Sequence, residues 1–338
     1  MSASLPHTVR SYVHGRFVDA TAPTDGSPAS SLRRNPATGE PLVEVPHASV
    51  ADVDAAVRAA ARAFEPGSPW RTISRRDRAR VLHGIGAVVR EHADELATLI
   101  TLENGKLWRE ARDDDQPDTA DIFDYYAGWT DKLYGEVSPV EGDALNLVTR
   151  DPIGVCALIV PWNFPLLLAA WKIAPALAMG NTVVVKPSPF TPLSLCRFVE
   201  LVHEAELLPP GVVNVVLGDG PTGEALVTHP AVAKVSFTGS TAVGRSILGG
   251  VARSNLASTT LELGGKSPNI VFDDVADLDA CIDRSFELMF AQKGEKCSEP
   301  TRFLLQRGIY ETCVEVVANG SPHTTASARA TRRSTKVS

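Results

Sequence analysis

Residues 154–186 read GVCALIVPWNFPLLLAAWKIAPALAMGNTVVVK, and this stretch decides the fold. Two short apolar runs, 154–160 and 182–185, flank a segment at 166–178 that has the length and apolar character of a buried helix. A buried strand, a helix and a second buried strand make up the unit from which parallel sheets are built. The stretch therefore predicts a parallel sheet with helices packed on its faces.

The same alternation continues along the chain. Helix-like and strand-like segments follow one another at 192–206, 212–216, 222–227, 233–237, 241 onward and 259–263. Strands that alternate with helices in this way indicate an α/β fold, and we predict a doubly wound, Rossmann-like parallel sheet over residues 153–261. A further strand at 269–272 and a helix at 277–290 indicate the start of a second α/β domain.

Composition excludes several classes of protein. The 338 residues carry a net charge of −7, so no basic surface for nucleic acid is expected. No run of eighteen apolar residues occurs, which predicts no membrane span, and the N-terminus has no secretory signal pattern. We expect a cytoplasmic protein that binds a small molecule.

The cysteines are scattered and form no C-x-x-C pair; they are Cys156, Cys196, Cys281, Cys297 and Cys313. This spacing predicts neither a disulfide framework nor a zinc site, and we expect no bound metal. Cys297 lies in a polar, glycine-containing segment, whereas Cys156 and Cys196 lie in apolar runs. A polar setting favours reactivity over packing, so Cys297 is expected to be the most reactive thiol.

Three segments follow predicted strands, where parallel-sheet proteins place their ligands. In Pro161–Pro165 two prolines fix a loop, and Asn163 could donate to a developing oxyanion or act only as a turn residue. In Lys186-Pro187-Ser188 the lysine could bind a nucleotide's ribose or phosphate, or be merely solvated. Residues 237–244, FTGSTAVG, offer backbone N–H groups to a pyrophosphate and lack a P-loop lysine.

Glu262 stands at the end of a predicted buried strand, before Gly264 and Gly265. Desolvation there would make its carboxylate a usable general base.

Together and in this order the motifs resemble the aldehyde dehydrogenase family. The resemblance covers about residues 12–310 and rests on PWNFP at 161–165, WK at 171–172, KPS at 186–188, FTGS at 237–240, LELGGKSPN at 261–269 and G-x-x-C at 294–297.

The resemblance implies oxidation of an aldehyde to a carboxylic acid with NAD or NADP, through a cysteine thioester. Cys297 would be the nucleophile, Asn163 an oxyanion donor, Glu262 the base that activates water and Lys172 a proton relay. Cofactor contacts are implied for Trp162, Lys186, Ser188, Gly239, Ser240, Gly244, Leu263 and Gly264. Trp171 would flank the aldehyde tunnel.

Two departures from the family pattern stand near these residues. Pro189 occupies the position at which the family usually has a glutamate that binds the adenosine ribose, which leaves NADP open as the cofactor. Gln292 and Glu295 stand where the family more often has asparagine and glutamine.

The resemblance also implies a domain organisation. Residues 1–131 and 153–261 form the cofactor-binding domain, 132–152 an oligomerisation hairpin, 262–318 an incomplete catalytic domain and 319–338 a tail. Family members are homo-oligomers and continue past this length with the Glu-x-Phe-Gly-Pro segment and an interface strand. We therefore expect a C-terminally truncated or frameshifted member, with apolar surface exposed near residues 270–272 and 288–290. The tail is either naturally disordered or a product of frameshift. The alternative functions are an inactive nucleotide-binding fragment and a misassembled product without function.

Overall fold

The computed structural model describes residues 9–22, 26 and 28–319. The chain forms two compact units that meet between Glu262 and Leu263, one residue after the predicted boundary. The predicted tail at 319–338 lies, apart from its first residue, outside the described residues.

A seven-stranded sheet forms the centre of the first unit. Its strands lie in the order β11-β10-β7-β8-β9-β1-β2. Their bounds are β11 (Ser258–Leu263), β10 (Val232–Gly239), β7 (Val155–Ile159), β8 (Thr182–Lys186), β9 (Val213–Val215), β1 (Ser11–Val13) and β2 (Arg16–Val18). Strands β10, β7, β8 and β9 pair in parallel, whereas β1 pairs antiparallel with β9 and β2. The predicted α/β fold with a parallel sheet is confirmed.

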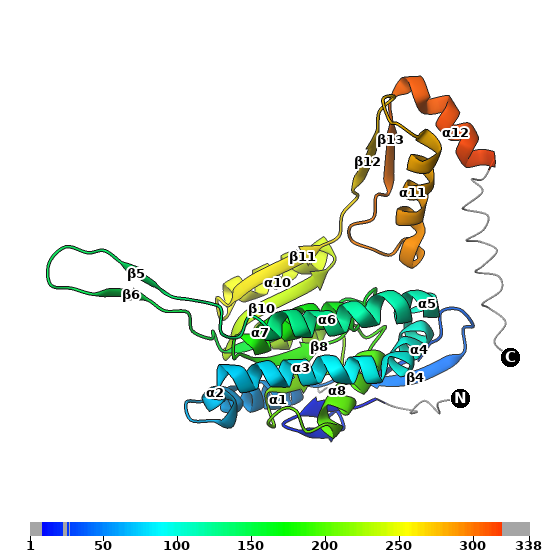
Figure 1. Ribbon diagram of the computed structural model, residues 1–338. Helices are drawn as coiled ribbons and strands as arrows, with labels where there is room; N and C mark the ends of the chain where they lie inside the picture. The colour runs from blue at the N-terminus through cyan, green and yellow to red at the C-terminus, as the bar shows by residue number, and fades with distance from the viewer. Residues whose placement is uncertain (1–8, 23–25, 27, 320–338) are drawn as a thin grey trace. The chain divides into compact units, whose positions relative to one another are not determined.

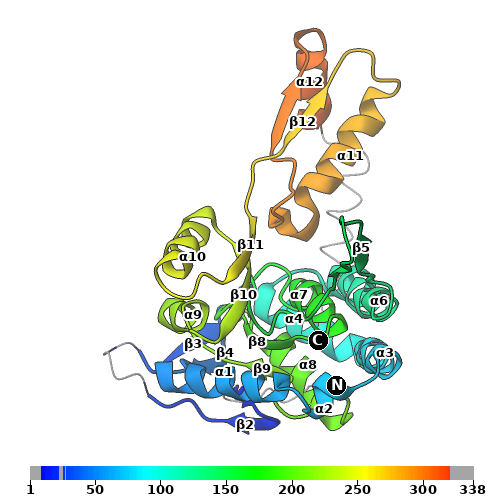
Figure 2. The same ribbon diagram turned by 90° about the vertical axis from the view of Figure 1, so that its left-hand side faces the viewer.

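Helices cover both faces of this sheet (Figure 2). One layer contains α1 (Val50–Phe64), α9 (Gly220–Val227) and α10 (Thr241–Arg253). The other contains α7 (Leu167–Ala178) and α8 (Leu193–Glu204), backed by α3 (Arg75–Glu91), α4 (Ala93–Asn104) and α6 (Gln116–Ala127). Short turns of helix complete the unit at α2 (Pro69–Thr72), α5 (Trp108–Glu110) and a π-helix (Ala111–Asp115). No described helix combines the length and apolar character needed to span a bilayer.

The helices on both faces of the sheet explain why its central strands are continuously apolar. Every residue of β8 is buried, and Val183, Val184 and Val185 are fully enclosed. A strand whose two faces are both covered has no solvent side, so it carries a continuous apolar run in place of an alternating pattern.

Local side-chain bonds fix where the helices begin. Ser49 caps α1 and forms a capping box with Asp52, since each side chain bonds the other residue's backbone N–H. The Ser74 hydroxyl accepts from the N–H of Asp77 at 3.0 Å, which fixes the start of α3. Such caps satisfy donors that the first helical turn leaves unpaired.

The N-terminal strands close one edge of the sheet with residues about 200 positions away. Tyr12 pairs with Val215 of β9, and the N–H of Leu217 donates to the Ser11 hydroxyl at 3.2 Å. The N–H of His14 donates to the side-chain carbonyl of Asn214 at 3.0 Å. The hairpin β1–β2 is therefore held by contacts with a distant part of the chain.

Two further hairpins lie outside the main sheet. Strands β3 (Ser30–Arg34) and β4 (Pro41–Pro46) pair antiparallel, as do β5 (Glu136–Ser138) and β6 (Asn146–Val148). In the second hairpin, which lies within the predicted 132–152 segment, Val137 is 68% exposed.

The second unit is a β-α-β arrangement (Figure 1). Strands β12 (Pro268–Val271) and β13 (Arg302–Leu305) pair in parallel, and α11 (Leu278–Phe290) lies between them in the chain. A 3₁₀ turn (Ala291–Gly294) follows α11, and after β13 come a second 3₁₀ turn (Arg307–Ile309) and α12 (Tyr310–Asn319).

Candidate functional site

The parallel strands of the first unit direct three loops to one edge of the sheet. The chain proceeds from β7 to β8 to β9 and then returns to the other side of β7 as β10. This reversal creates a crevice at the carboxyl ends of β7 and β10, where open α/β sheets bind ligands. The loop that contains Asn163 follows β7, Lys186 ends β8 and Ser240 follows β10. The topology therefore gathers these three predicted site residues at one edge.

Lys186 is a buried cation at the end of β8. It is 5% exposed, and its Nζ donates to the carbonyl of Pro187 at 3.1 Å. Burial lowers the pKa of this ammonium to about 8, against the opposing charge of Asp219. Ser188 is also buried, and its hydroxyl accepts from the N–H of Phe190 at 3.2 Å, which stabilises the turn after β8.

The turn after β10 presents a helix N-terminus. Ser240 is exposed and caps α10, its hydroxyl accepting from the N–H of Val243 at 3.3 Å. Gly239 is half-buried, and a Cβ there would lie 2.5 Å from the Phe237 ring, so any larger residue would have to displace that ring. The N–H of Gly244 donates to the Ser240 carbonyl within the helix, so it offers no donor to a ligand. The free donors are the amides of the first turn, at Thr241 and Ala242.

Lys172 points from α7 toward β10. Its side chain is buried, and Nζ donates to the hydroxyl of Ser236 at 3.2 Å. Burial lowers the pKa of Lys172 to about 8, and the nearby Glu262 carboxylate opposes that shift. The structure therefore brings these two predicted site residues into electrostatic contact.

The expected burial of Glu262 was wrong. Strand β11 alternates between exposed and half-buried residues, and Glu262 is one of the exposed ones. The reason is that β11 is the edge strand of the sheet, next to β10 alone. An apolar run in the sequence indicates a strand but does not show whether that strand is central or at an edge.

Cys297 lies in a turn of the second unit and is exposed, whereas Cys156, Cys196 and Cys313 are buried. The segment that begins with Leu263 and Gly264 passes beside it, because a Cβ built at Gly265 would lie 3.4 Å from the Cys297 carbonyl oxygen. The expected high reactivity of Cys297 stays a prediction.

The turn before Cys297 has an unusual backbone. Gln292 and Lys293 have φ values of 56° and 61°, and Gly294 follows at 75°. Residues with side chains rarely adopt this left-handed region, and they cluster at functional sites when they do.

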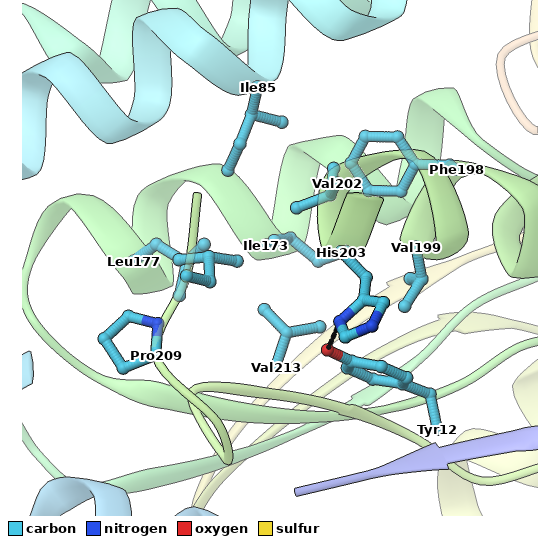
Figure 3. A pocket seen from close by; sticks show the side chains of 11 residues that line it. Tyr12, Ile85, Ile173, Leu177, Phe198, Val199, Val202, His203, Pro209 and Val213 are labelled. Carbon is cyan, nitrogen blue, oxygen red and sulfur yellow. Dashed lines mark hydrogen bonds between the residues drawn. The ribbon is translucent and has the colours of Figure 1, made fainter. Parts of the chain in front are cut away.

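An apolar cavity lies elsewhere in the first unit (Figure 3). It is lined by side chains of α3, α7 and α8 together with Tyr12, whose hydroxyl lies 3.1 Å from Nδ1 of His203. Val213, the first residue of β9, also lines it. The cavity therefore lies toward the amino ends of the parallel strands, opposite the loops that carry Asn163, Lys186 and Ser240.

Sequence reasoning missed a buried group beside the Asn163 loop. Glu103, Asn104 and Lys106, at the end of α4, are 5%, 6% and 1% exposed. Thr191 in the loop before α8 is 2% exposed. The available signal was the Asn-Gly pair at 104–105, which is typical of a helix end, but nothing in the pattern indicated buried charge.

Comparison with known proteins identifies the family of the chain. The sequence model described as "Aldehyde dehydrogenase family" matches residues 24–334. Human retinal dehydrogenase 2 is 47% identical over 281 residues, which cover 83% of this chain and 54% of that protein.

Solved structures give the same result. The NAD⁺ complex of an aldehyde dehydrogenase from Bacillus cereus is 42% identical with a TM-score of 0.85, covering 91% of this chain and 61% of that one. Gamma-glutamyl-gamma-aminobutyraldehyde dehydrogenase from Burkholderia cenocepacia has a TM-score of 0.87 at 42% identity, covering 95% and 65%. The chain spans about half the length of the curated relatives it matches. It belongs to the aldehyde dehydrogenase family.

Proposed function

We propose that the chain carries the cofactor site and the nucleophile of an NAD(P)-dependent aldehyde dehydrogenase. The observation that carries this proposal is the gathering of the Asn163 loop, Lys186 and Ser240 at one sheet edge in a family member whose Cys297 is exposed. The donor set at that edge fits a dinucleotide. Lys186 is a buried cation, and the first turn of α10 offers backbone N–H groups suited to a pyrophosphate. Trp162, Ser188 and Gly239 border the same edge.

The chemistry assigned to the side chains follows from their types. By the family resemblance, the Cys297 thiolate would add to the aldehyde carbonyl carbon and the carbonyl electrons would move to oxygen, for which Asn163 and the N–H of Cys297 are the proposed hydrogen-bond donors. Lys186 and the first turn of α10 would hold NAD⁺ or NADP⁺, which when bound would supply the hydride acceptor needed to oxidise this adduct to a thioester on Cys297. Glu262 removes a proton from water, which adds to the thioester, and the carbon–sulfur bond breaks to release the acid. Lys172, beside Glu262, relays the proton.

The choice between NAD and NADP is proposed to rest on Asp219. This residue precedes α9, makes no side-chain capping bond, and its carboxylate lies 3.6 Å from Nδ1 of His47. Its charge acts on Lys186. A carboxylate beyond a strand end binds the ribose diol of NAD, and its charge opposes the 2′-phosphate of NADP. We propose NAD as the preferred cofactor, with Asp219 supplying the carboxylate that Pro189 does not.

Titration of the protein with each nucleotide tests this preference. Asp219→Asn is expected to shift the ratio of NADP to NAD affinity by roughly tenfold toward NADP, or about 1.4 kcal/mol. An unchanged ratio would show that Asp219 does not face the ribose.

Two measurements test the proposed function as a whole. Nucleotide at about 100 times its dissociation constant should raise the free energy of unfolding by about 2.7 kcal/mol. NAD(P)H formation from a panel of small aldehydes should be lost in Cys297→Ser, while nucleotide binding is retained. Binding without turnover in the wild-type protein would support the alternative, a nucleotide-binding protein that does not catalyse. A cytoplasmic location and assembly through hairpin β5–β6 stay predictions.

A further inference from the structure

The carbonyl oxygen of Trp162, next to Asn163, accepts two side-chain hydrogen bonds. Nδ2 of Asn104 donates to it at 3.1 Å, and the hydroxyl of Thr191 donates at 3.2 Å. The two donors come from different parts of the fold, the end of α4 and the loop before α8. Both are buried, so water does not compete for the carbonyl as it would at the surface. The peptide that joins Trp162 to Asn163 is therefore fixed from two sides.

A buried cation holds the other side of Asn163. The ammonium of Lys106 lies 4.2 Å from the centroid of the Phe164 ring. It is also 2.5 Å from a carboxylate oxygen of Asp115, and these two side chains are 1% and 2% exposed. A desolvated ammonium over an aromatic face is attracted by the negative face of the ring. Because Asp115 fixes the ammonium, the Phe164 ring has a fixed partner.

Glu103 ties the Thr191 loop to the same helix end. Its carboxylate accepts from the N–H groups of Leu193 and Ser194 at 2.6 and 3.1 Å, and from the Ser194 hydroxyl at 2.5 Å. These are donors at the start of α8, two and three positions after Thr191. A carboxylate at a helix N-terminus bonds donors that the helix itself leaves unpaired.

Gly105 allows this arrangement. It ends α4 in the left-handed conformation, with φ of 81°. The chain therefore turns between Asn104 and Lys106, and the two side chains reach the residues on either side of Asn163.

We propose that Asn104, Lys106 and Thr191, with Glu103 supporting Thr191, are positioning residues that hold the 161–165 loop and thereby aim the Asn163 amide at the oxygen of the bound aldehyde. The part of this proposal that concerns the aldehyde rests on the proposed function. The part that concerns the loop rests on the contacts alone. None of these four residues touches the reacting atoms, so each acts through Asn163.

The size of the expected effect follows from the geometry of catalysis. Displacement of a catalytic group by about 1 Å can cost about a hundredfold in rate. An oxyanion donor acts only after charge develops on the oxygen, so its misplacement lowers kcat and leaves KM unchanged.

Thr191→Val is the sharpest test, because it removes the hydroxyl and keeps the shape of the side chain. Thr191→Ser restores the donor. Thr182→Val is the matched control, since Thr182 is equally buried and donates to a backbone carbonyl at 3.0 Å, but to Ala60 in α1. Asn104→Leu removes the second donor, and the double variant with Thr191→Val leaves the Trp162 carbonyl without either.

Hydrogen exchange of the backbone amides of Trp162, Asn163, Phe164 and Leu166 measures the loop without any need for turnover. Loss of one hydrogen bond should speed exchange there about fivefold in Thr191→Val and in Asn104→Leu, and further in the double variant. Thr191→Ser should return it to the wild-type rate, and Thr182→Val should leave it unchanged. Equal exchange in wild type, both single variants and the double variant would overturn the proposal.

Steady-state kinetics test the catalytic consequence. Thr191→Val is expected to lower kcat about tenfold with KM unchanged, and Thr191→Ser to restore it. Faster exchange with an unchanged kcat would overturn the link to Asn163. A wild-type protein without turnover would count against the proposed function, and the exchange rates would then decide the role of the four residues in holding the loop.

Discussion

The two units build parallel strands from similar apolar runs but bury them to different degrees. In the first unit β8 is covered on both faces, and all five of its residues are buried. In the second unit Ile270 of β12 is 56% exposed and Leu304 of β13 is 48% exposed, although these two residues pair with each other. Phe272 and Phe290 are 60% and 61% exposed, as predicted for the apolar surface near residues 270–272 and 288–290. An apolar run thus fixes the strand, while packing from other elements fixes its burial.

Local signals are equally good in both units. Ser49 caps α1 in the first, and in the second Asp277 caps α11 by accepting from the N–H of Ala280 at 2.9 Å. The difference between the units therefore lies in long-range packing, and long-range packing is what makes a buried charge possible.

The largest expected effect concerns ion pairs. Lys106→Met leaves the Asp115 carboxylate buried without its cation, which should cost about 3–5 kcal/mol of unfolding free energy. Arg284→Met removes the partner of Glu287 from an exposed pair in the second unit, in which both side chains are more than 60% exposed, and should cost under about 1 kcal/mol. Denaturant titration of each variant measures both. Similar losses for the two would contradict the difference in burial.

The next effect is a pH dependence confined to the first unit. Burial raises the pKa of Glu103 to about 7, against the hydrogen bonds from Leu193 and Ser194, whereas the unfolded chain ionises near 4.5. The native state holds this proton more tightly, so the contribution to stability is complete below about pH 4.5 and is lost as pH rises to about 7.

Glu103→Gln isolates this contribution. The stability of wild type relative to the variant should fall by about 3 kcal/mol across that window, at up to about 1.4 kcal/mol per pH unit. Unfolding free energies measured at several pH values check the slope. A difference that is constant from pH 4.5 to 7 would show that Glu103 is ionised throughout.

The buried thiol of Cys156 should react about two orders of magnitude more slowly than the exposed thiol of Cys297. Burial raises the pKa of Cys156 from 9.0 to about 11, and that of Cys196 further. A rise of two units lowers the thiolate fraction about a hundredfold at pH 8, and only the thiolate reacts. Limiting iodoacetamide followed by mass spectrometry should therefore label the exposed Cys297 first. Faster labelling of Cys156 in folded protein would contradict the burial of β7.

The smallest effect should be the same in both units. Ser49→Ala and Asp277→Ala each remove a helix cap and should each cost about 1 kcal/mol. Hydrogen exchange of the first turns of α1 and α11 measures each loss locally. A loss at α1 with none at α11 would show that the second unit lacks the stable helix described.

The sequence sufficed for the architecture because its signals are local. Apolar runs located β7 and β8. Strand ends identified the loops that contain Asn163, Lys186 and Ser240, since parallel strands bring their carboxyl ends to one edge.

Burial of polar residues could not be predicted in the same way. Glu103 accepts a hydrogen bond from Ser194, which is 91 positions away in the sequence. The Trp162 carbonyl accepts one from Asn104, which is 58 positions away. Charged residues at a helix end are usually solvated, so the sequence does not indicate that Glu103 and Lys106 are buried. For Glu262 the error was the reverse, since it was expected to be buried and is exposed. Only the order of the strands shows that β11 lies at the edge of the sheet.

The pairing of β1 with β9 has a consequence for how the chain folds. On a ribosome the hairpin β1–β2 emerges before β9, because Val215 and Asn214, which hold it, are made about 200 residues later. At about 5–20 residues per second this leaves the hairpin unpaired for some ten seconds or more. An isolated two-stranded hairpin is at best marginally stable in water. The edge of the sheet is therefore expected to close late, after the strands that follow it in synthesis have assembled, which makes the N-terminal segment the part of the first unit most exposed to mispairing during synthesis.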